Sequence, residues 1–170
     1  GSGFEVPALS ELSANPYGTG FNTDLNPMVF NGLDFGFRHK KASFRWEAVI
    51  FYTTASNELI RYELEDYPGQ NFYRNLGEST RYGIEVDASL YANKYHLIQG
   101  GLSIASYKFD YGETEKTLPG VPSSTANLGW TYKNNGWKVL IDGSFVGEYF
   151  ANNSNTIGTV SYTHLTLPTS

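Results

Sequence analysis

Hydrophobic and polar residues alternate along most of the chain between residues 29 and 150. From Ser43 to Thr53 every second residue is apolar, giving the series Phe44, Trp46, Ala48, Ile50 and Tyr52. Because successive side chains of a strand point to opposite faces, this period of two predicts a strand with one apolar face. The pattern recurs at residues 81–91, 98–104, 126–132 and 137–145, and more weakly at 33–38. The sequence therefore predicts an all-β fold with six consecutive antiparallel strands.

None of the predicted apolar faces carries a charge. The charged residues of the strands all fall on the opposite faces, and they are Asp34, Arg38, Arg45, Glu47, Arg81, Glu85, Asp87, Lys138 and Asp142. A lysine or arginine at the middle of a lipid-facing barrel surface costs about 2–4 kcal/mol, so a membrane barrel is expected to exclude charge in this way. Soluble sheets with one buried face show the same alternation, which leaves a soluble β-sandwich open.

The connections between the predicted strands differ regularly in length. Those at residues 38–42, 92–94 and 134–136 are short, whereas 61–77 and 110–124 are long and polar, and another long loop opens at Ala151. Short turns at one end and long loops at the other are typical of an outer-membrane β-barrel. The last strand, if extended from Trp137 to Tyr149, is roughly 40 Å long. Tilted by about 45°, it would rise roughly 28 Å and place these two aromatic residues at the two membrane interfaces.

The amino-acid composition narrows the classes of protein to which the chain can belong. The 170 residues include 18 Gly, 13 Tyr and 11 Phe but no Cys, which favours many strands joined by turns without disulfides. The net charge of −5 argues against nucleic acid as a partner. No apolar run reaches the roughly 18 residues that a membrane-spanning helix needs.

Several short motifs follow one another in a fixed order. They are Gly3 to Pro7 with Leu9 to Leu12, Gly20 to Pro27, Asn75-Leu76-Gly77 with Tyr82 to Glu85, Leu118 to Pro122, and Val146 to Asn153 with Asn155-Thr156. In this order and spacing they resemble the barrel of TonB-dependent outer-membrane receptors, from residue 1 to about 157. Two places depart from that family's pattern: Met28 stands where a Glu usually follows Pro27, and Ser123-Ser124 stand where a basic residue often occurs.

The resemblance implies an antiparallel up-and-down transmembrane β-barrel of 22 strands, with an N-terminal plug in its lumen. The six predicted strands would be roughly the fourteenth to nineteenth, with the long loops outside the cell and the short turns in the periplasm. Such a protein is a receptor and transporter of the bacterial outer membrane, not an enzyme. It is energised by the TonB complex and takes up a scarce nutrient, most often a ferric siderophore or another iron complex. A plug, an energy-coupling box and a closing strand are not found here, so we expect a piece of a longer protein whose partners include outer-membrane lipid, its own plug and the TonB complex.

The last eleven residues, 160–170, break the family pattern and fit no predicted barrel strand. They resemble the translated read-through of a sequencing adapter, although a divergent native loop is an alternative interpretation. We therefore expect a partial receptor barrel at residues 1–159 and a non-native tail at residues 160–170.

Two predicted loops combine aromatic and polar side chains. The candidate ligand contacts are Tyr17, Phe21 and Asn22 on the first loop, and Arg61, Tyr62, Tyr67, Phe72, Tyr73 and Arg74 on the second. Such residues suit anionic, ring-bearing ligands such as ferric chelates, through charge-assisted hydrogen bonds and stacking. The alternative is that the aromatic residues form an interface girdle and the arginines pair with lipopolysaccharide or Glu.

Seven charged strand residues are expected to face the lumen and the plug: Arg45, Glu47, Arg81, Glu85, Asp87, Lys138 and Asp142. Glu85 and Asp87 are close enough to act as paired carboxylates, but catalysis would also need a cleft and shifted pKa values. His39, His96 and His164 share no metal-ligand spacing with other candidate ligands, so no metal site and no cofactor are predicted. A soluble β-sandwich binding module, for instance for carbohydrate, and a non-transporting outer-membrane barrel remain the alternatives.

Overall fold

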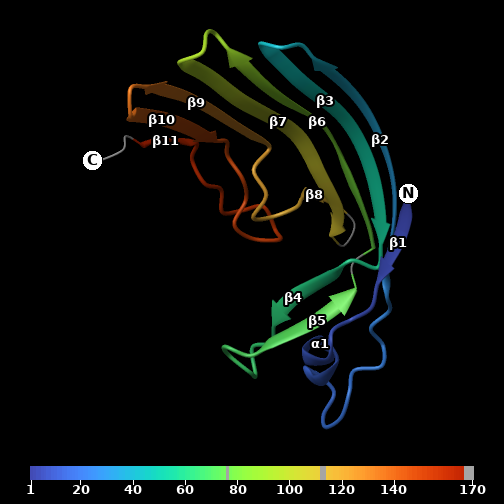
Figure 1. Ribbon diagram of the computed structural model, residues 1–170. Helices are drawn as coiled ribbons and strands as arrows, with labels where there is room; N and C mark the ends of the chain where they lie inside the picture. The colour runs from blue at the N-terminus through green and yellow to red at the C-terminus, as the bar shows by residue number, and fades with distance from the viewer. Residues whose placement is uncertain (76, 112–113, 167–170) are drawn as a thin grey trace.

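The computed structural model describes residues 1–75, 77–111 and 114–166 and is built almost entirely of antiparallel strands (Figure 1). One curved sheet has the order β1-β2-β3-β6-β7-β9-β10-β11, and β8 pairs with β7 beside this path. The strands of this sheet are β1 Ser2–Glu5, β2 Met28–Lys40, β3 Phe44–Ser56, β6 Glu78–Tyr91, β7 His96–Tyr111, β8 Thr114–Thr117, β9 Ser124–Asn134, β10 Trp137–Val146 and β11 Tyr162–Thr166.

A second, two-stranded sheet is formed by β4, Leu59–Glu63, and β5, Asn71–Asn75. The helix α1, Leu9–Ser13, lies against β5 at the end of the main sheet where the long loops are (Figure 1). In the described part of the chain, no helix has both the length and the apolarity needed to cross a membrane.

The prediction of six consecutive antiparallel strands is confirmed. They are β2, β3, β6, β7, β9 and β10, and each pairs with the next along the chain in the main sheet. The short turns join β2 to β3, β6 to β7 and β9 to β10. The last of these has Asn135 and Gly136 at φ 47° and 84°. Two positive φ values identify a type I′ turn, whose twist matches that of the flanking strands and fixes their register.

The long connections contain more structure than the sequence pattern indicated. The predicted loop 61–77 contains most of the β4–β5 hairpin, and the predicted loop 110–124 contains β8. The sequence pattern predicted only long polar connections here, because β8 is polar on both sides and β4 and β5 are too short to show a clear alternation. Their pairing is local instead, with a turn in which Tyr67 N donates to Leu64 O and Gln70 N donates to Tyr67 O. Residues 112–113, and Leu76 of the Asn75-Leu76-Gly77 motif, lie outside the described residues.

The extension of the last predicted strand to Tyr149 was also wrong. β10 ends at Val146, where the regular ladder with β9 reaches Thr125, although Gly147 N still donates to Ser124 O at 2.8 Å. Tyr149 instead pairs with Thr159, whose Oγ1 accepts a hydrogen bond from Tyr149 N at 3.1 Å. Tyr149 therefore lies outside β10, and its position at a membrane interface stays a prediction.

The expectation that no barrel strand forms after residue 160 was wrong as well. Tyr162–Thr166 form β11, which pairs antiparallel with Asp142–Val146 of β10. The unpaired edge of β10 offers free backbone groups that accept an extended segment of any side-chain pattern. Residues 167–170 lie outside the described residues, and the foreign origin of the tail stays a prediction.

Small residues allow the neighbouring strands to approach closely where the sheet curves. A Cβ on Gly83 would lie 2.5 Å from the backbone O of Ile104, and one on Gly129 would lie 2.6 Å from Asp142 Oδ1. A Cβ on Gly101 would lie 2.8 Å from Asp87 Oδ1. All three glycines share the charged face of the sheet. Asp side chains of the adjacent strands lie over Gly101 and Gly129, whereas the backbone of β7 approaches Gly83.

Candidate functional site

The strand register sorts the side chains of the main sheet into two faces. Directly opposed residues of antiparallel strands lie on the same side, so rows of side chains can be followed across the sheet. One row runs Phe37, Ala48, Val86, Leu102, Ala126, Phe145. The neighbouring row on the other side runs Arg38, Glu47, Asp87, Gly101, Asn127, Ser144. We call the first side the apolar face and the second the charged face.

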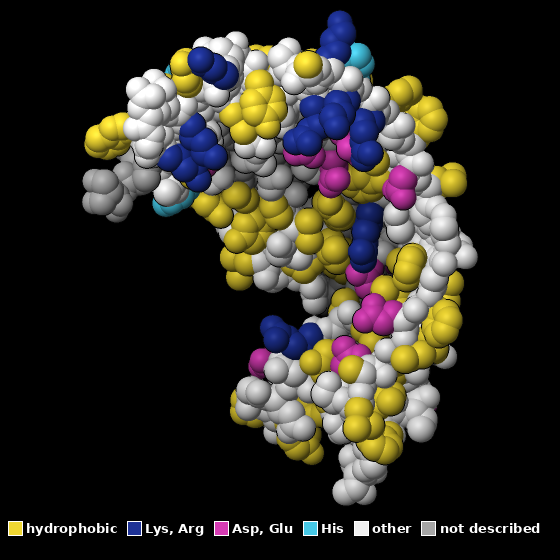
Figure 2. All heavy atoms as spheres, viewed as in Figure 1, with side chains coloured by type: hydrophobic (Ala, Val, Ile, Leu, Met, Phe, Trp, Pro, Cys, Tyr) yellow, Lys and Arg dark blue, Asp and Glu magenta, His cyan; other side chains and the backbone are white. Residues whose placement is uncertain are grey.

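In the part of the chain that the structure describes, no protein segment covers the apolar face. Leu33, Phe35 and Leu128 are 76%, 62% and 63% exposed, and Trp137 is 74% exposed. Figure 2 shows hydrophobic side chains along the convex margin of the curved sheet, whereas its inner side carries Lys, Arg, Asp and Glu together with further hydrophobic groups. A β-sandwich would cover such a face with a second sheet, and in the described residues none does so. An apolar surface of this extent requires a partner or a membrane.

Aromatic rings cluster on the apolar face at the short-turn end. Trp130 Nε1 donates a hydrogen bond to His96 Nδ1 at 3.2 Å, and the two rings stack with centroids 5.6 Å apart. Tyr132 lies 5.0 Å from His96 between ring centroids. Rings with one apolar side and one polar group concentrate at the two interfaces of a membrane. This cluster, together with the exposed Trp137, indicates where the apolar band ends on the short-turn side.

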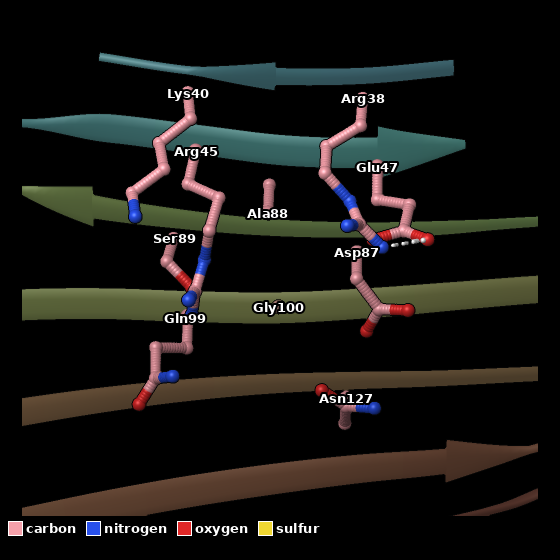
Figure 3. A pocket seen from close by; sticks show the side chains of 10 residues that line it. All are labelled: Arg38, Lys40, Arg45, Glu47, Asp87, Ala88, Ser89, Gln99, Gly100 and Asn127. Atoms are coloured by element: carbon pink, nitrogen blue, oxygen red, sulfur yellow. Dashed lines mark hydrogen bonds and ion pairs between the residues drawn. The ribbon is translucent and has the colours of Figure 1, made fainter. Parts of the chain in front are cut away.

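The charged face forms a shallow groove of about 580 Å³ near the same end (Figure 3). In the groove, Arg38 and Glu47 form a two-pronged ion pair, with Nε donating to Oε2 at 2.8 Å and an Nη to Oε1 at 3.0 Å. Arg45 donates to Ser89 Oγ at 3.4 Å, a long hydrogen bond. Among the described residues, neither Arg45 nor Asp87 has an ion-pair partner.

The structure places all seven predicted lumen residues on the charged face. By register, Glu47 and Asp87 share one row, Arg45 and Asp142 share the next, and Glu85 and Arg81 lie in two further rows of the same side. Lys138 follows on the side of Asp142, four residues earlier in β10. That this face borders a lumen and a plug stays a prediction.

An ion pair joins the β4–β5 hairpin to strand β6 of the main sheet. Glu58, directly before β4, accepts hydrogen bonds from Arg81 and from Ser79 Oγ in β6. The side chain of Glu58 is 14% exposed and that of Arg81 is 32% exposed, so the pair is largely withdrawn from water. Arg81 Nε is buried without a hydrogen-bond partner among the described residues. We call this contact the hairpin latch.

Asparagine side chains reinforce the latch. The amide of Asn75 donates to the backbone O of Asn57 at 2.6 Å and of Asn26 at 2.9 Å, and its Oδ1 accepts from Asn26 N at 2.7 Å. Ile60 of β4 also packs with Phe109 of β7 and with Leu118 in a small buried cluster. The hairpin is thereby held across the long-loop end of the charged face (Figure 1).

Six of the nine candidate ligand residues lie on this one hairpin or its turn. Phe72 is only 2% exposed, between the rings of Tyr62 and Tyr67 at 6.1 Å and 5.9 Å. The guanidinium of Arg74 lies 5.2 Å from the Tyr62 ring centroid, a cation–π contact. Arg61 is exposed and Tyr73 is partly exposed. In this arrangement Phe72 supports the hairpin, while the arginines and Tyr67 are accessible to a ligand.

The other three candidates lie in the first loop. Tyr17 and Phe21 are 78% and 57% exposed, whereas Asn22 is buried. Asn22 Oδ1 accepts from Asp24 N at 3.2 Å, and Asn22 N donates to Leu12 O at 2.7 Å, which fixes the turn after α1. The role of all nine residues as ligand contacts stays a prediction. The described residues contain no group of three or more His, Asp or Glu side chains placed to hold a metal ion.

Comparison with known proteins identifies the family. The family model described as TonB dependent receptor-like, β-barrel matches residues 1–167. The chain belongs to this family. The resemblance predicted from the motifs is thereby confirmed, as is a location in the bacterial outer membrane. TonB-dependent receptors are not enzymes, in agreement with the absence of a predicted catalytic site.

Solved receptor structures share the fold at low sequence identity. The copper transporter OprC superposes with a TM-score of 0.78 at 17% identity, covering 96% of this chain and 27% of that structure. The ferric yersiniabactin uptake receptor FyuA from Yersinia pestis gives 0.70 at 15% identity, covering 96% and 25%. The ferric preacinetobactin receptor BauA from Acinetobacter baumannii gives 0.62 at 16%, covering 95% and 24%. The chain thus spans about a quarter of the length of these receptor structures.

Proposed function

We propose that this TonB-dependent receptor chain is part of the barrel wall of a larger importer. In that importer about 22 strands enclose a plug domain, and the TonB complex supplies the energy for uptake. The cargo is a scarce nutrient, with a ferric siderophore or another iron complex as the first choice. The chain contributes strands and loops to the barrel wall, and the complete barrel transports the nutrient.

The observation that carries the proposal is the division of one sheet into an exposed face whose central rows carry no charge and a charged concave face. Lipid can cover the apolar face without burying a charge, whereas a Lys or Arg at the middle of that face would cost about 2–4 kcal/mol of stability. On the second, Arg45 and Asp87 are charged groups without ion-pair partners in the described residues. Both facts are explained when lipid bathes one face and water and a plug domain occupy the other.

The nature of the cargo is supported by two independent features. The β4–β5 hairpin presents Arg61, Arg74 and Tyr67 at the long-loop end, which is extracellular in barrels of this architecture. Cations beside aromatic rings bind anionic chelates through charge and stacking. In addition, the similar structures are named for the uptake of copper, ferric yersiniabactin and ferric preacinetobactin.

Uptake by the full-length receptor tests this function. Cells that lack their own iron receptors would express it and be given ⁵⁵Fe bound to catecholate, hydroxamate or phenolate chelators. We expect at least one complex to accumulate, dependent on TonB. Arg74→Gln should reduce uptake at low ligand concentration about tenfold, since one charge-assisted hydrogen bond is worth about 1.5–3 kcal/mol.

Lys41→Gln, the same loss of charge in the β2–β3 turn at the opposite end, serves as the matched control and should leave uptake unchanged. No uptake of any chelate, or uptake that persists without TonB, would contradict the proposal. The second outcome would favour a non-transporting or passive barrel.

A further inference from the structure

The basic residues of the chain are concentrated at the short-turn end. Seven of the twelve Lys and Arg lie in the turns or in the strand ends beside them: Arg38, Lys40, Lys41, Arg45, Lys94, Lys133 and Lys138. Figure 2 shows the dark blue groups gathered over this end of the sheet. Barrels of this architecture place their short turns in the periplasm. The basic end therefore lies beside the periplasmic leaflet of the outer membrane.

Three of these lysines line one pocket between two adjacent turns. Lys94 and Tyr95 come from the β6–β7 turn, and Lys133, Asn134, Trp137 and Lys138 come from the tip of the β9–β10 hairpin. The pocket measures about 580 Å³ and has no carboxylate in its lining. Lys133 N donates to Tyr95 O at 2.9 Å, which holds the two turns together. We call this site the rim pocket.

The charges of the rim pocket are uncompensated in the described residues. Lys133 and Lys138 face each other directly across β9 and β10, and like charges in opposed positions destabilise a sheet. None of the three lysines is in an ion pair, and Lys94 lies over the Tyr95 ring at 4.8 Å. An anion bound between the lysines would remove this repulsion.

We propose that the rim pocket binds the phosphate of an anionic phospholipid headgroup in the periplasmic leaflet. Lys133 and Lys138 start from the charged face, but they line the same pocket as Trp137, which belongs to the apolar face. The pocket thus extends around the tip of the turn to the lipid side of the wall, and this favours lipid over an acidic protein segment. The pocket therefore lies at the lip of the barrel wall, level with the Trp130, His96 and Tyr132 rings that mark the membrane interface. Long lysine side chains reach from such a position to headgroups while their stems stay on the wall.

The inference rests on family membership and on the position of the short turns, and it does not depend on the cargo. Each lysine near an anionic membrane surface contributes about a fivefold gain in affinity. Removing the charges of Lys133 and Lys138 should therefore weaken binding of an anionic lipid about 25-fold at low salt. Binding of a neutral lipid should not change.

Native mass spectrometry of the full-length receptor in mild detergent can measure the binding of each lipid, with anionic phosphatidylglycerol and neutral phosphatidylcholine added in turn. We expect selective retention of phosphatidylglycerol that is lost in Lys133→Gln/Lys138→Gln and restored in Lys133→Arg/Lys138→Arg. Lys108→Gln/Lys116→Gln makes the same change of charge in the two strands of the β7–β8 hairpin, where Lys108 pairs with Glu115; this control should retain the lipid.

Three results would overturn the proposal. The first is equal retention of phosphatidylglycerol by the Lys133→Gln/Lys138→Gln receptor and the control. The second is displacement of the lipid by millimolar inorganic phosphate, which would make the pocket a site for free phosphate. The third is efficient carbodiimide cross-linking of Lys133 or Lys138 to an Asp or Glu of the same receptor, which would show that a protein segment occupies the pocket.

Discussion

Leu102→Arg is expected to cost the barrel about 2–4 kcal/mol of stability in a bilayer, the largest loss from any single change considered. Leu102 lies in the middle row of the apolar face, between Val86 and Ala126 on the neighbouring strands. Within hydrocarbon the guanidinium has no hydrogen-bond partner except by thinning the membrane. Refolding of the full-length receptor from urea into lipid vesicles, followed by heat modifiability on gels, measures the loss.

Ser103→Arg is the matched control, because residue 103 is the next position of the same strand and points to the charged face. There the new guanidinium would lie opposite Glu85. We expect this variant to fold within about 0.5 kcal/mol of the native receptor, as substitutions outside packed sites usually do. Equal losses for both arginine variants would mean that the two faces do not differ in their surroundings.

Glu58→Gln is expected to release the β4–β5 hairpin from the wall. The change leaves Arg81 without its carboxylate in a site where the arginine is 32% exposed. Breaking a fully buried ion pair from one side costs about 3–5 kcal/mol, and partial exposure reduces this to roughly 2 kcal/mol. Amide hydrogen exchange in Leu59–Glu63 and Asn71–Asn75 should then be about 30-fold faster than in the native receptor, with strands β6 and β7 unchanged.

Glu63→Gln provides the comparison for this experiment. Glu63 lies at the other end of β4, is exposed and has no ion pair among the described residues. Its replacement should leave exchange in the hairpin unchanged. If Glu58→Gln exchanges no faster than Glu63→Gln, the latch does not hold the hairpin.

The strands that cross the apolar band could be predicted from the sequence because each of their residues meets one of two different surroundings. Along β6, Ile84 and Val86 alternate with Glu85 and Asp87, and this alternation identifies strand, face and register together. Where the two faces of a strand have the same surroundings, the alternation of apolar and polar residues disappears. The strand extension to Tyr149 failed because the end of β10 depends on where its ladder with β9 stops, which the sequence of β10 alone does not show.

At the long-loop end, the sequence likewise predicted only part of the candidate site. The sequence indicated which aromatic and cationic residues gather in the second loop, but their burial depends on contacts distant in the chain. Phe72 is buried between the Tyr62 and Tyr67 rings. The latch joins Glu58 to Arg81 across 23 residues, and no local pattern predicts such a pair.

The central claim is that hydrocarbon covers the apolar face while water or the plug covers the charged face. These 170 residues contain no cysteine. In a full-length receptor whose other cysteines are replaced, single cysteines at positions 81–91 of β6 can each carry a nitroxide spin label. Collision rates with oxygen, which concentrates in lipid, and with a water-soluble nickel chelate then report the surroundings of each position. We predict oxygen maxima at 82, 84, 86, 88 and 90, with nickel collisions there at their lowest. Uniformly low collision rates with both reagents at these five positions would contradict the claim, because they would place a second layer of protein over the apolar face.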